Sequence, residues 1–132
     1  MTQLRLLLLG PPRIERDNQI LEVDTRKATA LLAYLALSGE RPSRDWLAAF
    51  LWPEYDDNRA KAALRRTLSA LKSAVGAAAI SASRETIGLE ANAVWCDATA
   101  FRQALQQGDV SAAVTLYRDD FLAGFSLRDS IP

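Results

Sequence analysis

The chain has 132 residues, enough for one ordinary domain or for one small domain and part of another. Apolar residues make up 49% and charged residues 24%, which is typical of a globular protein and argues against a disordered chain. Histidine is absent and Cys96 is the only cysteine, which excludes histidine-based acid–base catalysis, histidine metal sites and an internal disulfide. We therefore expect a cytoplasmic protein that is not an enzyme and that uses no metal or cofactor.

The charges are balanced in number but not in position. Lys+Arg and Asp+Glu both count 16, so the formal net charge is zero. Six basic residues lie between Asn58 and Arg84, and no carboxylate lies among them. A basic run alone fits either a solvated helix face or a nucleic-acid-binding surface, so its structural setting has to decide between them.

The first part of the chain predicts a small antiparallel sheet of three short strands. The leucine-rich run from Leu4 is ended by Gly10 and Pro11, and its length favours a strand over a buried helix. Asp17-Asn18 is a turn dipeptide between the next two extended segments, residues 13–16 and 20–23.

Two helices are expected next. The first covers residues 26–37, with Thr25 as its N-cap and Gly39 as its stop. Ser43 then caps a second helix over residues 44–51. Its side chains expected to face the core are Trp46, Leu47, Phe50 and Leu51, and Trp52 is likewise expected in the core. Pro53 ends this helix and opens a short acidic loop.

The most informative segment is the helix expected over residues 57–75, which starts near Asp57 or Asn58 and stops at Gly76. Leu64, Leu68, Leu71 and Val75 are spaced by four, three and four residues, which puts them on one stripe. The opposite face carries small, polar and cationic side chains and no large apolar one. Its members, with the cations that flank it, are Asn58, Arg59, Lys61, Ala62, Arg65, Arg66, Ser69, Lys72 and Ser73.

A β-hairpin over residues 78–89, with Arg84 at its tip, follows this helix. Residues 94–96 form one more extended piece. Asp97 is expected to cap a helix that ends near Gln107, with Phe101 and Leu105 facing inward, and a second short helix starts at Val110 and runs to about Arg118. The two make a helical hairpin.

Strands, three helices and then a hairpin are the order of an α+β winged helix-turn-helix domain, in which the third helix enters the major groove of DNA and the hairpin is the wing. Arg65 and Arg66 suit bidentate contacts with guanine, and Asn58 suits adenine or a phosphate. Arg84 could reach a phosphate or a narrow minor groove. The full predicted DNA-binding set is Asn58, Arg59, Lys61, Arg65, Arg66, Ser69, Lys72 and Arg84.

Two other classes of function remain to be weighed. A protein-interaction adaptor that has lost DNA binding would need an acidic or apolar front on the third helix, and here that front is basic and polar. An enzyme would need a nucleophile–base pair, and the sequence offers none. The carboxylates Glu54, Asp56 and Asp57 lack the spacing of a calcium loop, so no metal site is expected.

The sequence resembles bacterial regulators of the Streptomyces antibiotic regulatory protein (SARP) type, which join an OmpR/PhoB-type winged helix to a helical bacterial transcriptional activator domain. The resemblance covers essentially the whole chain. It is carried most specifically by Leu51-Trp-Pro-Glu54 and by the Leu-Arg-x-x-Leu-x-x-Leu pattern within residues 63–72, and also by residues 6–10, 26–36, 97–101, 116–118 and 121–124.

This resemblance implies a transcription activator with a winged-helix domain over residues 1–95 and the start of a helical, tetratricopeptide-like activator domain over residues 96–132. It implies binding to promoter DNA, often at direct repeats occupied by two copies side by side, and so a homodimer on DNA. It also implies that Pro53, Glu54, Tyr55 and Asp56 touch RNA polymerase or a neighbouring copy. Family members continue through further helical repeats, so we expect either that this chain is a truncated piece of a larger regulator or that the activator function is missing.

Overall fold

A computed structural model describes residues 3–23, 25–117 and 121–122 of the chain. The predicted Arg118 end of the last helix and residues 123–124 of the family resemblance lie outside this range. The strands are β1 (Leu4–Leu7), β2 (Arg13–Arg16), β3 (Gln19–Ile20), β4 (Ile80–Ala82), β5 (Ile87–Leu89) and β6 (Val94–Cys96). The α-helices are α1 (Arg26–Ser38), α2 (Arg44–Leu51), α3 (Asp57–Val75), α4 (Asp97–Gln106) and α5 (Val110–Leu116), and short 3₁₀ turns cover Ala77–Ala79 and Ala91–Ala93.

The N-terminal sheet has the expected three strands, although the third covers Gln19–Ile20 instead of residues 20–23, and a fourth strand joins them. Its order is β3-β2-β1-β6, with β1–β2 and β2–β3 antiparallel. Asp17 and Asn18 have φ values of 55° and 65°, the left-handed conformations of a tight hairpin turn that Asp and Asn tolerate. Strand β6 lies parallel to β1, with Leu6 opposite Cys96. The antiparallel pairing expected for the three N-terminal strands is confirmed, but the sheet as a whole is mixed, because β6 joins β1 in parallel after the three helices and the hairpin.

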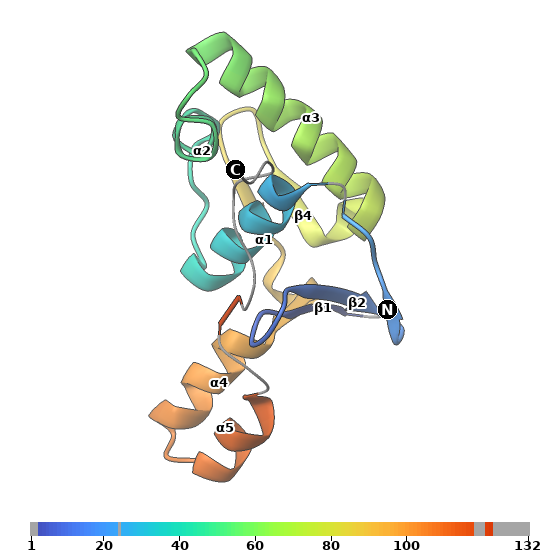
Figure 1. The fold of residues 1–132 in the computed structure, drawn as a ribbon, viewed down its shortest axis with the longest axis vertical. Coiled ribbons are helices and arrows are strands. Elements are labelled where there is room, and N and C mark those ends of the chain that lie inside the picture. The colour runs from blue at the N-terminus through green and yellow to red at the C-terminus, as the bar shows by residue number, and fades with distance from the viewer. Residues whose placement is uncertain (1–2, 24, 118–120, 123–132) are drawn as a thin grey trace, which may run out of the picture.

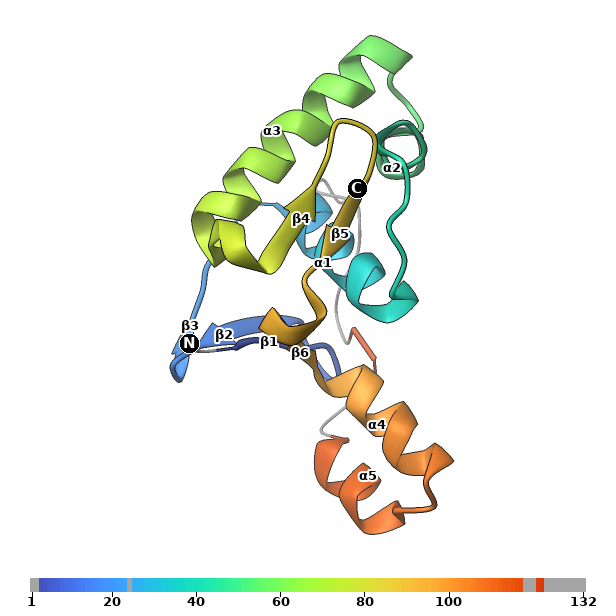
Figure 2. The same cartoon turned by 180° about the vertical axis from the view of Figure 1, so that it is seen from behind.

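Helices α1, α2 and α3 and the β4–β5 hairpin lie together on one side of this sheet, as Figures 1 and 2 show from opposite directions. One apolar core joins them: Leu6 of β1, Leu31 of α1, Leu47 of α2, Leu71 of α3 and Ile87 of β5 are all buried in it. The caps follow the predicted pattern. Thr25 and Ser43 each accept a hydrogen bond from the backbone of the following helix, and Gly39 closes α1 at φ 67°.

The aromatic side chains of α2 differ from the expectation. Trp52 is buried, but Trp46 and Phe50 are 45% and 49% exposed. They stack on each other with ring centroids 4.9 Å apart, and Tyr34 of α1 lies beside both. Helix α2 has eight residues, and its buried stripe is completed by Leu47, Ala48 and Leu51, which leaves the two rings at the edge of the core.

The α4–α5 hairpin lies on the far side of the sheet from α3 (Figures 1 and 2). Asp97 was expected to cap α4, but the N-cap position is held by Cys96, which forms no side-chain cap hydrogen bond. Asp97 is 1% exposed, and its two carboxylate oxygens accept the backbone N–H groups of Leu8 at 2.7 Å and Leu9 at 3.1 Å. The carboxylate thus ties the start of α4 to the end of β1. Leu105, also expected to face inward, is 50% exposed.

Within the part of the chain that the structure describes, no helix combines the length and the apolar character needed to cross a membrane.

Candidate nucleic-acid interface

Helix α3 is the longest helix of the described residues and is fixed at both ends. Its N-cap is Asp56, whose Oδ1 accepts the backbone N–H of Arg59 at 2.9 Å, so the cap lies one residue before the expected position. Gly76, at φ 91°, donates its N–H to the carbonyl of Lys72 and ends the helix. The predicted bounds of residues 57–75 are confirmed.

The apolar stripe of α3 holds the helix from behind, as expected. Leu64, Leu68, Leu71 and Val75 are between 0% and 4% exposed. At about 25 cal/mol per Å² of buried apolar surface, each such side chain contributes roughly 1.5–3 kcal/mol of transfer free energy. The stripe therefore fixes which face of α3 points outward.

The opposite face of α3 is open to solvent. Asn58, Arg65, Arg66, Ser69 and Ser73 are exposed, and Lys72 is half-buried. Among the described residues, the side chains of Arg65, Arg66 and Lys72 form no ion pair or hydrogen bond. The expectation that this cationic side faces outward is confirmed, whereas its contacts with DNA remain a prediction.

Two cations of the predicted set are engaged within the protein. Lys61 Nζ lies 3.5 Å from Asp45 Oδ1 on α2, and the guanidinium of Arg59 stacks on the ring of Tyr55 at 4.2 Å from its centroid. Lys61 therefore leans toward α2 and Arg59 toward the loop before α3. A surface ion pair contributes only about 0–1 kcal/mol and an exposed cation–π contact about 0.5–1 kcal/mol, so both side chains stay accessible to a stronger partner.

The hairpin is attached to the start of α2. Thr86 bridges Ser43, and the backbone N–H of Arg44 donates to the Glu85 carbonyl at 2.7 Å. Figure 2 shows the β4–β5 hairpin running between α2 and α3. The predicted hairpin over 78–89 is shorter than expected, because Ala77–Ala79 form a 3₁₀ turn and pairing begins at Ile80. Arg84 is exposed at the tip, where the Ser83 hydroxyl accepts the N–H groups of Glu85 and Thr86 and orders the turn.

Two further cations lie against the hairpin, and neither of them was predicted from the sequence. Arg44 Nε donates to the Ser83 carbonyl at 2.8 Å, and Arg41 lies across Gly88, where a Cβ atom would come within 2.8 Å of its side chain. Arg41 precedes α2 and Arg44 is its first residue, so both lie outside the basic run of the sequence. The sequence offered one signal for this arrangement, which is the position of Arg44 in the first turn of α2.

The loop between α2 and α3 is partly structural. Pro53 and Glu54 are exposed, but Tyr55 is half-buried against the core and Asp56 caps α3. Of these four residues, Pro53 and Glu54 are therefore the ones that a partner could bind without disturbing the packing of Tyr55 or the cap of α3. Among the described residues, no group of three or more His, Cys, Asp or Glu side chains could hold a metal ion.

Comparisons with known proteins found similarity among solved structures. Neither a scan against protein-family models nor a search of curated proteins found a match. Among solved structures, the chain is similar to Mycobacterium tuberculosis EmbR in complex with a low affinity phosphopeptide, at 26% identity and a TM-score of 0.69. The similarity covers 92% of this chain and 38% of the EmbR chain, so this chain spans well under half the length of that protein.

EmbR is a transcription regulator of the SARP family and not an enzyme. The fold of this chain is accordingly similar to the SARP-type winged helix.

Proposed function

We propose that this chain binds promoter DNA in a sequence-specific manner, with α3 in the major groove and the β4–β5 hairpin as the wing. One observation carries the proposal: α3 is buried along its leucine stripe and presents free cations on the opposite side. A recognition helix needs this combination, because it must be rigid while its outer side chains reach phosphates and base edges.

The proposed contacts follow from position and chemistry. Arg65 and Arg66 form planar guanidinium forks suited to guanine, while Asn58 and Ser69 supply shorter polar contacts. Lys72 and Arg84 would contact phosphates, and Arg44 on α2 adds a cation next to the wing. On binding, Arg59 would leave the Tyr55 ring and Lys61 would leave Asp45, and both would contact phosphates instead.

Activation is the second part of the proposal. Residues 1–95 would form the DNA-binding domain and residues 96–132 the start of a helical activator domain. Two copies would occupy direct repeats side by side as a homodimer on DNA, and the loop of Pro53, Glu54, Tyr55 and Asp56 would touch RNA polymerase or the neighbouring copy. Exposure of Pro53 and Glu54 supports this placement of the loop.

The test begins with selection of bound duplexes from a random DNA pool. Fluorescence anisotropy then measures the affinity of the chain for the enriched duplex and for a scrambled duplex at several salt concentrations. If five or six phosphates are neutralised, log affinity should fall against log salt with a slope of roughly −4 to −5. Enrichment of one sequence with this slope supports the proposal.

Two other results would contradict it. A slope near zero with no enrichment would favour a protein-interaction adaptor, which the similarity to a regulator does not support. Equal affinity for enriched and scrambled duplexes would retain DNA binding but remove sequence recognition. The Glu54→Ala variant tests the loop: it should retain affinity for DNA while losing activation in transcription with purified RNA polymerase.

A further inference from the structure

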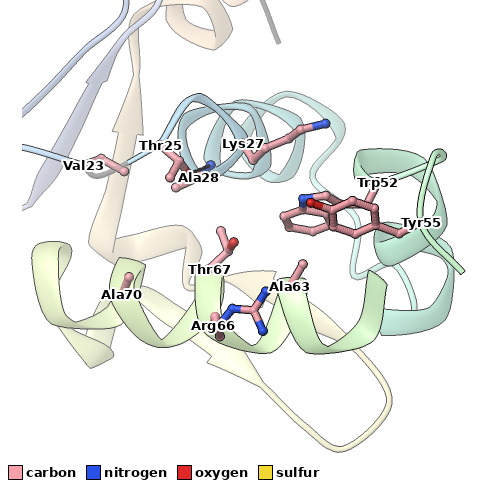
Figure 3. Close-up of a pocket in the computed structure, with 10 residues that line it drawn as sticks. All are labelled: Val23, Thr25, Lys27, Ala28, Trp52, Tyr55, Ala63, Arg66, Thr67 and Ala70. Carbon is pink, nitrogen blue, oxygen red and sulfur yellow. Dashed lines mark hydrogen bonds between the residues drawn. The ribbon is translucent and has the colours of Figure 1, made fainter. Parts of the chain in front are cut away.

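A cleft lies between the N-terminal half of α1 and one flank of α3 (Figure 3). Its volume is about 310 Å³, at the lower end of the range of roughly 300–1,000 Å³ for small-molecule sites. The residues that line it are Val23, Thr25, Lys27, Ala28, Trp52, Tyr55, Ala63, Arg66, Thr67 and Ala70. Arg66 therefore belongs both to this cleft and to the outer face of α3.

The shape of the cleft follows from small residues beside large rings. Ala28 on α1 and Ala63 and Ala70 on α3 leave the space between the two helices unfilled. The rings of Trp52 and Tyr55 lie at one end of it (Figure 3). Such walls suit a flat, apolar ligand body, because offset ring contacts stabilise a complex beyond the area that they bury.

The electrostatics of the cleft favour an anion. Lys27 Nζ donates to the Leu51 carbonyl and lies 5.7 Å from the Trp52 ring centroid, and Arg59 is stacked on Tyr55. In the described part of the chain, neither the guanidinium of Arg66 nor the hydroxyl of Thr67 has a hydrogen-bond partner. The described lining residues include the cations Lys27 and Arg66 and the hydroxyl of Thr67, and no carboxylate.

We infer that this cleft binds a small aromatic carboxylate, with its ring against Trp52 and Tyr55 and its carboxylate on Arg66 and Thr67. A guanidinium fork binds a carboxylate through two parallel hydrogen bonds, which fixes the ligand's orientation. If α3 reads DNA as proposed above, the bound ligand withdraws Arg66 from the duplex. The ligand is then an effector that lowers DNA affinity, and DNA lowers ligand affinity by the same factor.

The direct test needs no DNA. The full chain, labelled with ¹⁵N, is titrated with 2-naphthoate while the indole N–H signals of Trp46, Trp52 and Trp95 are followed by NMR. We expect a saturable shift of the Trp52 signal, with the signals of the other two changing little. The neutral analogue 2-naphthalenemethanol should bind at least about tenfold more weakly, because it lacks the charge-assisted hydrogen bonds. An unmoved Trp52 signal, or equal affinity for the two probes, would overturn the inference.

Variants locate the site. Ala70→Leu fills the cleft and should abolish the Trp52 shift, whereas Ala62→Leu places the same side chain on the outer side of α3 and should leave the shift intact. Arg66→Gln, at an exposed position that does not threaten folding, should weaken 2-naphthoate binding by about tenfold and leave the neutral analogue unaffected. Full affinity for 2-naphthoate in Arg66→Gln would contradict the assigned role of Arg66.

The regulatory half is tested separately. Saturating 2-naphthoate should weaken binding of the selected duplex by about tenfold in the unmodified chain and have no effect in Ala70→Leu. If 2-naphthoate binds but the DNA affinity does not change, the effector role is wrong and the binding site stands. If the chain binds no DNA at all, the proposed function fails, and the NMR result still decides whether the cleft is a carboxylate site.

Discussion

Helix α3 and the α4–α5 hairpin are both amphipathic in sequence, but they bury their apolar sides to very different extents. Leu64, Leu68, Leu71 and Val75 of α3 are 0–4% exposed, whereas Leu105 is 50% exposed, Val110 63% and Val114 67%. Behind α3 lies a core supplied by α1, α2, the sheet and the hairpin. Helices α4 and α5 pack mainly on each other, and α4 also contacts β1, β6 and α1.

The comparison shows that an amphipathic pattern predicts the apolar side of a helix but not whether that side is covered. In α3 the covered side fixes the orientation of the cations on the other side, so the polar face is the functional one. In α4–α5 the exposed side chains include the large apolar Leu105, Val110 and Val114, as in a helical repeat whose outer side is not covered by the described residues. Stability and function should therefore respond to substitutions differently in the two regions.

The largest contrast is expected between two leucine truncations. Leu71→Ala removes a fully buried side chain and should lower the free energy of unfolding by about 2–5 kcal/mol. Leu105→Ala removes a half-exposed one and should cost less than about 1 kcal/mol. Urea denaturation followed by circular dichroism measures both. Equal losses would show that the two regions are not packed differently.

Asp97 ties the α4–α5 hairpin to the end of β1, and its removal should have the next largest effect. Asp97→Ala leaves the buried N–H groups of Leu8 and Leu9 without an acceptor and should cost about 2–4 kcal/mol. Asp97→Asn keeps one acceptor oxygen and should lose less. The same denaturation experiment ranks the two variants. A stable Asp97→Ala protein would mean that the carboxylate is not what holds α4 to β1.

The N-cap of α3 should contribute less than Asp97 to the free energy of unfolding. Asp56→Ala removes the acceptor for the Arg59 N–H and should destabilise the chain by about 1 kcal/mol. Asp57→Ala is the matched control, because the Asp57 side chain at the first helical position is not the cap. If Asp57→Ala costs more than Asp56→Ala, the helix begins elsewhere than the structure places it.

The smallest effect is expected for the pair of Lys61 and Asp45. Asp45→Asn removes a surface ion pair and should change the free energy of unfolding by less than about 0.5 kcal/mol. It also frees Lys61 and removes a negative charge from the proposed DNA-facing side, so affinity for the selected duplex should rise slightly. A marked loss of DNA affinity would place Asp45, and with it α2, in a role that the present account does not give it.

The sequence carried enough information for the bounds and orientation of α3. Its stop at Gly76, its leucine spacing and its carboxylate-free front are all local features, and local features fix a helix and its faces. The same reasoning failed for Trp46 and Phe50, because helical spacing alone does not show where the core ends.

Contacts between distant parts of the chain could not be predicted in this way. Asp97 accepts hydrogen bonds from Leu8 and Leu9, and β6 joins β1, only because the whole fold brings the two ends of the chain together. The positions of Arg41 and Arg44 against the hairpin, and the cleft beside Arg66, likewise depend on tertiary packing.

The central claim is that the free cations on the outer side of α3 bind DNA. The most direct measurement is the affinity of Arg65→Ala/Arg66→Ala for the selected duplex, compared with Arg5→Ala/Arg102→Ala, which removes the same charge from exposed positions on β1 and α4. At about 1–3 kcal/mol for each base-reading arginine, the first variant should lose at least about 30-fold in affinity and the control should stay within a few-fold. Unchanged affinity of Arg65→Ala/Arg66→Ala, or an equal loss in both variants, would contradict the account.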